Sequence, residues 1–429
     1  MNKKIKPFLK KKIPPLKITS QSSELEKLKF QINSAKSNEE LSDLFLRIAD
    51  IYMGKKEFFL AEDYFEKFLA INPNHIEGNI GYTHILYANN KKKHSLDLAE
   101  KLYQKNPHNI PILSLSAYIN TLENNHSRAI ELSKAIIDIE PDYVFAYHTI
   151  QSNSIVLKRF QETIKYSRKF LDKNPNDLES LKNLAITYTY LGNYKESIKI
   201  LRKIEALDPI NHIIGSLLPF ISTQTGKKEQ TNYIDQPLDF ISEFHIDLEN
   251  QENLKFKDDI ISYLKKCEKD WSPKNKSTNK GYQTTSFELS HGTYPLNKLK
   301  LLFQKKINEY IQKYSSSNTL FIKHLNEKRQ FSCWGVFLKN NGFQESHNHS
   351  SGWLSAVFYL DIPDKLKGDE GNIEFSLHGY EFPKNSNIIP KKIIEPKDGK
   401  LILFPSTLYH KTIPFKSKKE RISMAFDLY

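Results

Sequence analysis

The spacing of apolar residues changes once along the chain, from a helical period to short runs typical of strands. Apolar positions predict amphipathic helices at 23–37, 254–269 and 296–314. After about residue 330, runs rich in Val, Ile, Phe and Tyr are separated by Gly, Pro, Asn and Asp, which indicates strands joined by turns. Polar residues 273–285 predict a loop. The predicted strands are 332–338, 354–360, 372–376, 400–404 and 421–428.

A repeat of constant length organises the helical part. Prolines stand at positions 73, 107, 141, 175 and 209, so each interval is 34 residues. Small residues at matching positions allow the two helices of a hairpin to approach, and each Pro ends the second helix because it cannot continue the backbone ladder. The first and fifth copies keep the same small and apolar positions before their prolines: Ala49, Tyr52, Ala61 and Phe65 in one, Ala185, Tyr188, Ser197 and Leu201 in the other.

This pattern resembles the tetratricopeptide repeat, whose period is 34 residues. The resemblance covers residues 42–211 as five repeats, although Ser95, Asn120 and Gln151 stand where the family prefers Ala, Tyr or Gly. It implies an all-α solenoid with a concave groove that binds a protein or peptide. The alternative is a spacer or a dimerisation arm. We expect a leading helix at 23–41 before the repeats, and a capping helix and linker at 212–232 after them.

Composition narrows the class of protein. Lys and Arg exceed Asp and Glu by 13 over 429 residues, and residues 1–17 hold seven lysines and no acid. We interpret 1–22 as a disordered basic tail and expect no nucleic-acid partner. The two cysteines, Cys267 and Cys333, give no disulfide framework, and no stretch has the ~20 apolar residues of a membrane helix. These features predict a cytoplasmic protein with no membrane partner.

Three histidines are candidates for a metal site. His347 and His349 stand two residues apart just before a predicted strand, so in an extended chain their side chains share a face and can reach one ion. His410 follows the predicted strand 400–404, and Arg421 begins the last predicted strand. Two or three imidazoles with open coordination positions suit Fe(II), Zn or Cu.

The order of these residues resembles the Fe(II)- and 2-oxoglutarate-dependent dioxygenases, in particular the oxygenase group related to prolyl hydroxylases. The resemblance spans residues 233–429 and implies a double-stranded β-helix, which is a cupin-like jelly roll, with flanking helices. The predicted fold class is therefore multidomain α+β. The motifs that carry the resemblance are His347-Asn-His349-Ser-Ser-Gly-Trp-Leu-Ser-Ala-Val-Phe-Tyr-Leu, Gly399-Lys-Leu-Ile-Leu-Phe-Pro-Ser, His410 and Arg421-Ile-Ser-Met-Ala-Phe-Asp.

The resemblance also implies roles. His347 and His410 match the two histidine ligands of the family, and His349 stands where the common site has a carboxylate. Arg421 matches the residue that holds the distal carboxylate of 2-oxoglutarate, a task that suits the planar fork of arginine. Ser423 and Tyr359 are candidates for further hydrogen bonds to that carboxylate. No catalytic residue beyond the metal ligands is predicted.

The predicted function is that of a dioxygenase, a hydroxylase that takes Fe(II) as cofactor and 2-oxoglutarate and O2 as cosubstrates. Its repeats would recruit a protein or peptide substrate. Two alternatives stay open from the sequence. One is a non-enzymatic adaptor with a degenerate barrel. The other is a cupin-type metal enzyme that does not use 2-oxoglutarate.

Overall fold

The computed structural model describes residues 18–248, 250–273, 276–289, 293–325, 327, 330–349, 351–364, 366–379, 381–385 and 389–429. The chain divides into two compact units, Met1–Pro175 and Asn176–Tyr429. Among the helices of the described residues, none combines the length and the apolar character needed to cross a bilayer.

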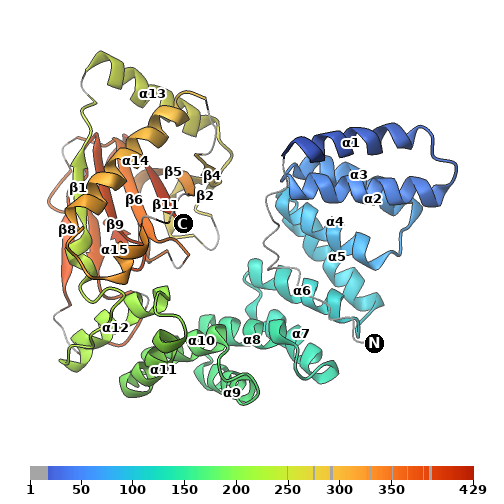
Figure 1. Cartoon of the computed structure of the whole chain (residues 1–429), viewed down its shortest axis with the longest axis horizontal. Coiled ribbons are helices and arrows are strands. Elements are labelled where there is room, and N and C mark those ends of the chain that lie inside the picture. The colour runs from blue at the N-terminus through green and yellow to red at the C-terminus, as the bar shows by residue number, and fades with distance from the viewer. Residues whose placement is uncertain are drawn as a thin grey trace. The chain divides into compact units, whose positions relative to one another are not determined.

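Helical hairpins make up the first unit, and successive helices pair along the chain (Figure 1). Helices α2 and α3 form the first hairpin, α4 and α5 the second, α6 and α7 the third, and α8 and α9 the fourth. The helices are α1 (Ile18–Ile32), α2 (Asn38–Gly54), α3 (Phe58–Ile71), α4 (Ile76–Ala88), α5 (Lys92–Lys105), α6 (Ile110–Leu122), α7 (His126–Ile139), α8 (Val144–Val156) and α9 (Phe160–Leu171).

The residues that carry the repeat are those that the hairpins bury. Ala49 and Ala61 are fully buried where α2 meets α3, and Tyr52 and Phe65 fill the space beside them. Helix α3 ends at Ile71, before the first repeat proline. The degenerate positions Ser95, Asn120 and Gln151 are also buried. Their polar side chains can be tolerated there when they bond to the backbone, as Ser95 Oγ does by donating to Thr83 O at 2.8 Å.

The turn inside each hairpin contains one residue in the left-handed region. These residues are 34 positions apart, as are the prolines, but only the last is glycine. A side chain in this conformation costs about 1–2 kcal/mol relative to glycine. The residues are Lys56 (φ 61°), Asn90 (φ 61°), Asn124 (φ 63°), Lys158 (φ 55°) and Gly192 (φ 68°).

The predicted leading helix, 23–41, has the wrong bounds. Helix α1 ends at Ile32, and α2 begins at Asn38 because the Ser37 side chain caps it by accepting from Glu40 N at 3.1 Å. The predicted tail, 1–22, is wrong in its last residues, since 18–22 belong to α1. Residues 1–17 of that tail lie outside the described residues.

The second unit contains the fifth hairpin, a further helix and an antiparallel sheet. Its helices are α10 (Leu178–Tyr190), α11 (Tyr194–Leu207), α12 (His212–Thr225), the 3-10 helix η1 (Pro237–Phe240), α13 (Gln251–Lys266), α14 (Leu296–Lys313) and α15 (Leu320–Leu325). Its strands are β1 (Ser242–His245), β2 (Lys269–Trp271), β3 (Thr278–Thr284), β4 (Phe287–Glu288), β5 (Phe331–His347), β6 (Leu354–Asp361), β7 (Ile373–Ser376), β8 (Lys391–Ile394), β9 (Lys400–Pro405), β10 (Tyr409–Thr412) and β11 (Arg421–Leu428).

The long strand β5 joins the two sides of a curled half-barrel. The strand order is β1-β9-β6-β11-β5-β10-β7-β8, with β3 and β4 also paired to β5. The first half of β5 pairs with β11, and its end pairs with β10. The predicted loop at 273–285 is wrong, because 278–284 form β3 and pair with β5. Its polar residues occupy a strand with a partly exposed face. Such a strand contains no continuous run of apolar residues, so a search for apolar runs misses it.

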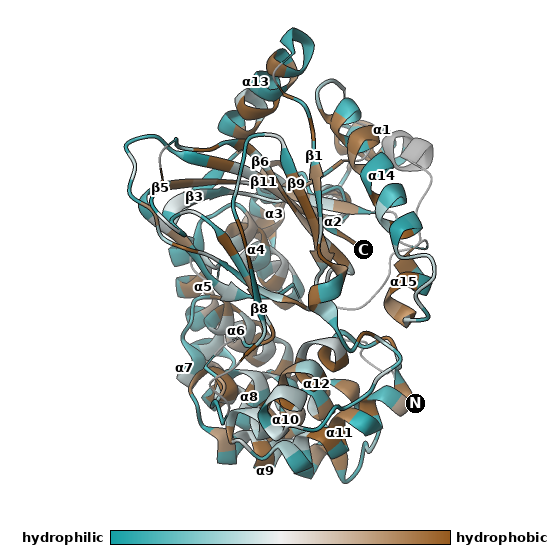
Figure 2. Cartoon of the chain, turned by 90° about the vertical axis from the view of Figure 1, so that its left-hand side faces the viewer, coloured by the Kyte–Doolittle hydropathy of each residue, from teal (hydrophilic) through white to brown (hydrophobic). Residues whose placement is uncertain are grey.

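Helices cover the outer face of the sheet, and the inner face forms a second apolar layer. On α14, the Phe303 ring lies 4.4 Å from the Phe426 ring of β11. Because side chains alternate along a strand, the neighbours of Phe426 face inward. An inner cluster includes Tyr359, Phe375 and Phe404. Strands β6 and β9 are buried on both faces and are largely brown in Figure 2.

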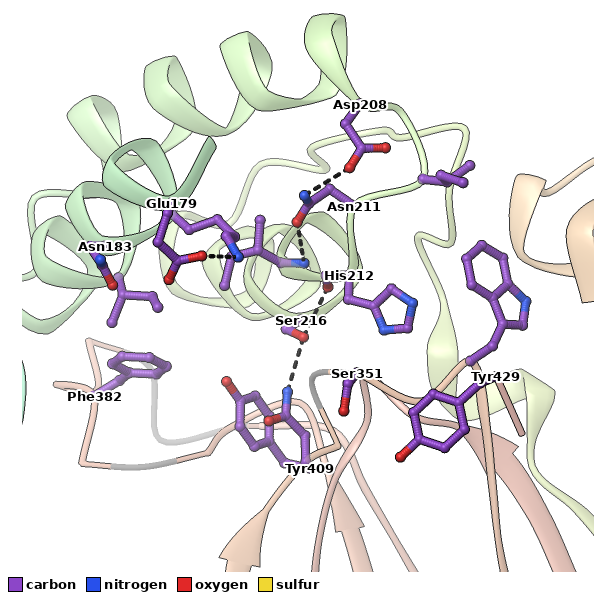
Figure 3. Close-up of a pocket in the computed structure, with 16 residues that line it drawn as sticks. Glu179, Asn183, Asp208, Asn211, His212, Ser216, Ser351, Phe382, Tyr409 and Tyr429 are labelled. Carbon is purple, nitrogen blue, oxygen red and sulfur yellow. Dashed lines mark hydrogen bonds and ion pairs between the residues drawn. The ribbon is translucent and has the colours of Figure 1, made fainter. Parts of the chain in front are cut away.

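The last hairpin and α12 pack directly on loops of the barrel. Tyr194 Oη on α11 donates to Pro383 O at 2.8 Å. On α12, Ser216 Oγ lies 3.3 Å from Thr407 O, and Figure 3 shows Ser216 directed toward the barrel loops. We predicted a boundary between repeats and barrel at 212–232, but the structure divides the chain after Pro175, because these contacts join the fifth repeat to the barrel.

Candidate metal centre

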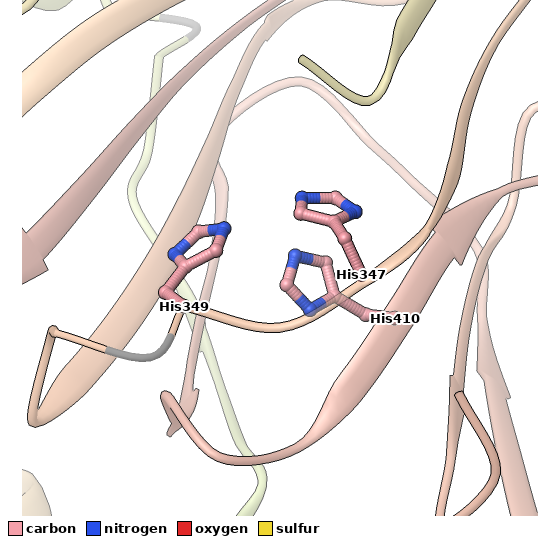
Figure 4. A group of neighbouring side chains, drawn as sticks. All are labelled: His347, His349 and His410. Atoms are coloured by element: carbon pink, nitrogen blue, oxygen red, sulfur yellow. The ribbon is translucent and has the colours of Figure 1, made fainter. Parts of the chain in front are cut away.

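Three imidazoles converge at one end of the barrel (Figure 4). The register of the sheet pairs His410 on β10 directly with His347 on β5. His349 follows the end of β5, and its backbone N–H donates to Ser406 O at 2.9 Å. The ring centroids of His347 and His410 are 4.3 Å apart, and His349 lies 5.2 and 5.0 Å from them. The strand pairing therefore brings together residues that are 63 positions apart in sequence.

The hydrogen bonds at Nδ1 determine which nitrogen of each ring is available. The Nδ1–H of His347 donates to Glu345 O at 2.7 Å, and that of His410 donates to Leu408 O at 3.1 Å. The Nδ1–H of His349 donates to Asp427 Oδ1 at 2.6 Å. Carbonyl and carboxylate oxygens only accept, so all three rings carry their proton on Nδ1 and leave Nε2 as the ligand. Ser277 Oγ donates to Nε2 of His347 at 3.2 Å.

The spacing of the histidines suits one small cation. One ligand nitrogen from each ring lies within 4.8 Å of the others. Imidazole nitrogens bound at about 2.1 Å to one ion are roughly 3 Å apart when they occupy adjacent positions. Three histidines on one side of an ion leave its other positions open for other ligands.

The protein keeps the site in the state that a metal requires. Burial, reinforced by the neighbouring His349, lowers the pKa of His347 to about 4. Burial and the two neighbouring histidines lower the pKa of His410 well below its usual value. Both rings are therefore neutral near pH 7, and metal binding does not have to displace a proton from them.

Asp427 is the residue that the sequence analysis missed. It is buried at the end of β11, accepts from His349 and also accepts from Ser355 Oγ at 2.6 Å. Ser355 in turn bonds to Ser406 Oγ at 2.8 Å. The alternation of β11 was the available signal, because Arg421, Ser423 and Asp427 are separated by even steps and share one face. The predicted set of metal ligands contains no carboxylate. In the structure, the carboxylate of Asp427 is hydrogen-bonded to His349.

A second cluster contains the other predicted site residues. Arg421 is 1% exposed, and its guanidinium carbon lies 4.9 Å from the centre of the Tyr359 ring. Its Nη1 donates weakly to Ser423 Oγ at 3.4 Å. Within the described part of the chain, neither Arg421 Nε nor Tyr359 Oη makes a hydrogen bond of ordinary geometry, although the two side chains interact with each other. Burial lowers the pKa of Arg421 and raises that of Tyr359 to about 12. This buried cation has no carboxylate in an ion pair among the described residues.

The two clusters face the same interior. On β11, Arg421 lies toward one end and Asp427 toward the other, and the residues between them on this face are the small Ser423 and Ala425. On the neighbouring strand, Tyr359 opposes Ser423 and Ser355 opposes Asp427. The inner apolar cluster spans the interval, since Phe404 packs in the same cluster as Tyr359 and its ring lies 4.8 Å from that of His410.

A cavity of about 740 Å³ leads to the histidines from outside. His347, His349, Asp427 and Trp334 line it. Residues on and around β3 also line it: Asp270, Pro273, Lys276, Ser277 and residues 283–286. His410 and Arg421 are not among its lining residues. The cavity therefore reaches the exposed side of the metal centre, and the arginine cluster lies on the barrel side.

Comparisons with known proteins agree with this architecture. A family described as "Tetratricopeptide repeat" matches residues 42–75 and 178–211, the first and fifth copies. A family described as "Putative 2OG-Fe(II) oxygenase" matches residues 332–427, from β5 to β11. The chain thus contains tetratricopeptide repeats and a segment that matches this oxygenase family. Both family predictions and the α+β fold class are confirmed.

Solved structures similar to this chain include the following three. A tetratricopeptide repeat protein from Parabacteroides merdae ATCC 43184 is 15% identical, with 52% of this chain and 85% of that chain covered at a TM-score of 0.42. YrrB, "a TPR protein with an unusual peptide-binding site", is 14% identical, with 44% and 96% covered at 0.37. PilW, a type IV pilus biogenesis factor, is 16% identical, with 47% and 91% covered at 0.41. None of the curated proteins compared with the chain matches it.

Proposed function

We propose that the chain is an Fe(II)- and 2-oxoglutarate-dependent dioxygenase that hydroxylates a protein or peptide substrate. His347, His349 and His410 would bind the metal through Nε2. Arg421, assisted by Ser423 and Tyr359, would bind the distal carboxylate of 2-oxoglutarate. The bound iron would supply the activation of O2, which no side chain of the protein can perform.

The observation that carries the proposal is the unpaired Arg421. A buried guanidinium without an acidic partner is costly, because desolvation disfavours the charge and no carboxylate offsets the loss. Arg421 Nε and Tyr359 Oη, on the same side of the barrel, make no hydrogen bond of ordinary geometry to a described residue. A dicarboxylate with one end on the metal and the other on Arg421 would satisfy both groups. The fit of the donor atoms thus supports 2-oxoglutarate as the cosubstrate.

The charge of a bound metal ion could also be offset although all three proposed ligands are neutral. The common iron site of this family has two histidines and one carboxylate. In this chain, the negative charge lies one hydrogen bond farther out, on Asp427, which accepts from the ligand His349 at 2.6 Å. Asp427 would offset the charge of the metal while His349 occupies the coordination position. We therefore retain iron as the proposed metal despite the substitution.

The unpaired arginine also separates this proposal from its alternatives. A cupin-type enzyme that does not use 2-oxoglutarate needs no buried cation behind its metal. A degenerate barrel in an adaptor would not need three rings that share one tautomer. Only the dioxygenase proposal uses both the histidines and Arg421.

Binding and turnover of 2-oxoglutarate test the proposal. The full chain, loaded anaerobically with Fe(II), should bind 2-oxoglutarate in calorimetry and release succinate when O2 is admitted. His410→Ala should abolish both the metal content and succinate release, whereas His245→Ala, at an exposed histidine of β1, should leave both unchanged. Metal-loaded protein that fails to bind 2-oxoglutarate would favour the cupin-type or adaptor alternative.

The remaining parts of the proposal concern the repeats and the location. We propose that the repeats recruit the substrate, which is what stacked helical hairpins commonly do. We also propose a cytoplasmic location. In support, both cysteines are free thiols in the structure, as a reducing compartment would keep them.

A further inference from the structure

A second cavity lies between the fifth repeat, α12 and the barrel (Figure 3). Its volume is about 710 Å³. Helix α10 contributes Asn183 and Ile186, α12 contributes Ile213 and Ser216, and the barrel contributes Phe382 and Tyr409. One wall is thus formed by the repeat and the other by the oxygenase domain. We call this space the repeat cavity, and the space beside His347 and His349 the histidine cavity.

The two cavities are adjacent and share part of their lining. Asn348, Ser351 and Tyr429 line both of them. Asn348 stands between the two histidines of the His-x-His motif, so the same loop that presents the metal ligands forms the floor of the repeat cavity. A molecule lying against α10 and α12 can therefore extend past this loop to the exposed side of the metal centre.

Helix α12 also holds that loop in place. Asn348 Nδ2 donates to Ser216 Oγ at 3.0 Å and lies 3.3 Å from Thr407 O. Ser216 is itself bonded to Thr407 O. This network joins the helix that follows the repeats to Asn348, which lies between the two histidines in sequence. The repeat cavity is therefore bounded by elements that are hydrogen-bonded to one another.

The combined size and the chemistry of the two adjacent cavities favour a polypeptide. A site for one small molecule typically occupies about 300–1,000 Å³, and cavities of about 710 and 740 Å³ together exceed that range. The repeat cavity combines aliphatic side chains and aromatic rings with the amides of Asn183, Asn211 and Asn348. Apolar surface and amides are what the side chains and main chain of a peptide require.

The charge of the lining argues against an acidic segment. In the repeat cavity, Glu179 and Asp208 face a single cation, Lys182, which already lies 2.6 Å from Glu179. In the histidine cavity, Asp270 and Asp427 face Lys276. Acids thus outnumber cations in both cavities, although the chain as a whole carries a net charge of +13.

We infer that the repeat cavity binds an extended, neutral or basic segment of a polypeptide substrate, and that this segment passes Asn348 to place one residue in the histidine cavity. The inference rests on the proposed function, because it assigns the substrate class of the same metal centre. It goes further in making the fifth repeat a wall of the substrate site in addition to a recruiting module.

Selection from a displayed library of random 12-residue peptides tests the inference. The full chain loaded with Mn²⁺, without 2-oxoglutarate, serves as the bait, so binding is measured without turnover. Ile186→Lys and Ile213→Lys place a charge in the repeat cavity at half-buried positions. Both should raise the Kd of selected peptides at least tenfold. Leu207→Lys, at an exposed position of α11 that does not line the cavity, is the matched control and should leave the Kd unchanged.

Paramagnetic broadening locates the peptide relative to the metal. Mn²⁺ in the wild-type chain should selectively broaden the NMR signals of one or two peptide residues, and Zn²⁺ should not. Peptides that bind Ile186→Lys and Ile213→Lys as tightly as wild type, or that show no broadening, would overturn the inference. So would selection of acidic sequences only, or of no sequence. Failure of the proposed function has a different signature, because the wild-type chain would then not bind Mn²⁺ or 2-oxoglutarate in calorimetry.

Discussion

Asp427 Oδ1 lies 2.6 Å from Nδ1 of His349, so a buried carboxylate of the last strand orients a ring that comes from the end of β5. This contact fixes the tautomer of His349 and strengthens Nε2 as a donor. We expect Asp427→Asn to weaken Fe(II) or Mn²⁺ binding by roughly 10- to 100-fold, as measured by calorimetry. Asp361→Asn, the same change on β6 outside the site, should not alter the Kd. If Asp427→Asn and wild type bind the metal with equal affinity, Asp427 has no role in metal binding.

The three histidines should act as one set. Removing His410 leaves two imidazoles, and we expect His410→Ala to raise the Kd for Mn²⁺ by at least about 100-fold. Thermal unfolding followed by circular dichroism checks that the variant remains folded. If His410→Ala binds the metal as wild type does, the predicted ligand set is wrong.

Arg421 should destabilise the ligand-free protein. Its charge is buried without an acidic partner, so Arg421→Met should raise the free energy of unfolding of the ligand-free chain by about 1–2 kcal/mol in urea titrations. The same variant should lose the rise in Tm that 2-oxoglutarate gives the metal-loaded wild type.

Arg202 provides the contrast for Arg421. Its guanidinium is paired with Glu205 at 2.7 Å and with Glu229 at 2.8 Å. Arg202→Met should therefore not stabilise the protein and should retain the response to 2-oxoglutarate. A destabilised Arg421→Met chain that still responds to 2-oxoglutarate would contradict the assigned role of Arg421.

The stability of the metal-free protein should depend on pH. Burial lowers the pKa of His347 to about 4, and that of His410 is also lowered, whereas both titrate near 6.5 in an unfolded chain. Between these values the unfolded chain binds protons that the folded chain does not. The contribution of the two neutral histidines to the free energy of unfolding is therefore fully present above pH 6.5. It is lost as the pH decreases toward 4. Urea unfolding between pH 7 and 5 should show this decrease, and His347→Asn should show a smaller one.

The hairpin turns of the repeats offer a test of the fold alone. Lys158 has a φ of 55°, in a turn where the fifth repeat has Gly192 at 68°. Lys158→Gly should raise the free energy of unfolding by about 1 kcal/mol, because glycine removes the cost of the left-handed conformation. Lys165→Gly, inside α9, should lower it by a similar amount.

How much the sequence could predict differs between the repeats and the barrel. The 34-residue period identifies the hairpins because small residues such as Ala49 and Ala61 must be buried at each helix crossing. The His-x-His motif and His410 were also visible, because their order along the chain, followed by Arg421, resembles that of the oxygenase family. The pairing of His410 with His347 was seen only in the structure. The helix bounds near Ser37 were missed because a cap depends on one side chain, which periodicity does not detect.

The rest of the site depends on contacts that no local pattern shows. The polar segment that contains Ser277 resembles a loop in sequence, but part of it pairs with β5 and places Ser277 beside His347. Asp427 was visible in the sequence, yet its partner His349 is 78 residues away. The contact of Ser216 with Asn348 joins elements that sequence analysis assigned to different domains. Each of these contacts is determined by packing between residues distant in sequence, and not by local secondary-structure propensity.

The division of the chain after Pro175 has a consequence for how such a protein can change over time. Hairpins before that point can be gained, lost or exchanged without replacing any wall of the two cavities. The fifth hairpin has no such freedom, since α10 lines one cavity and Tyr194 is bonded to a barrel loop. Sequence variation should accumulate in the early hairpins, while the fifth hairpin should change together with the barrel that it contacts.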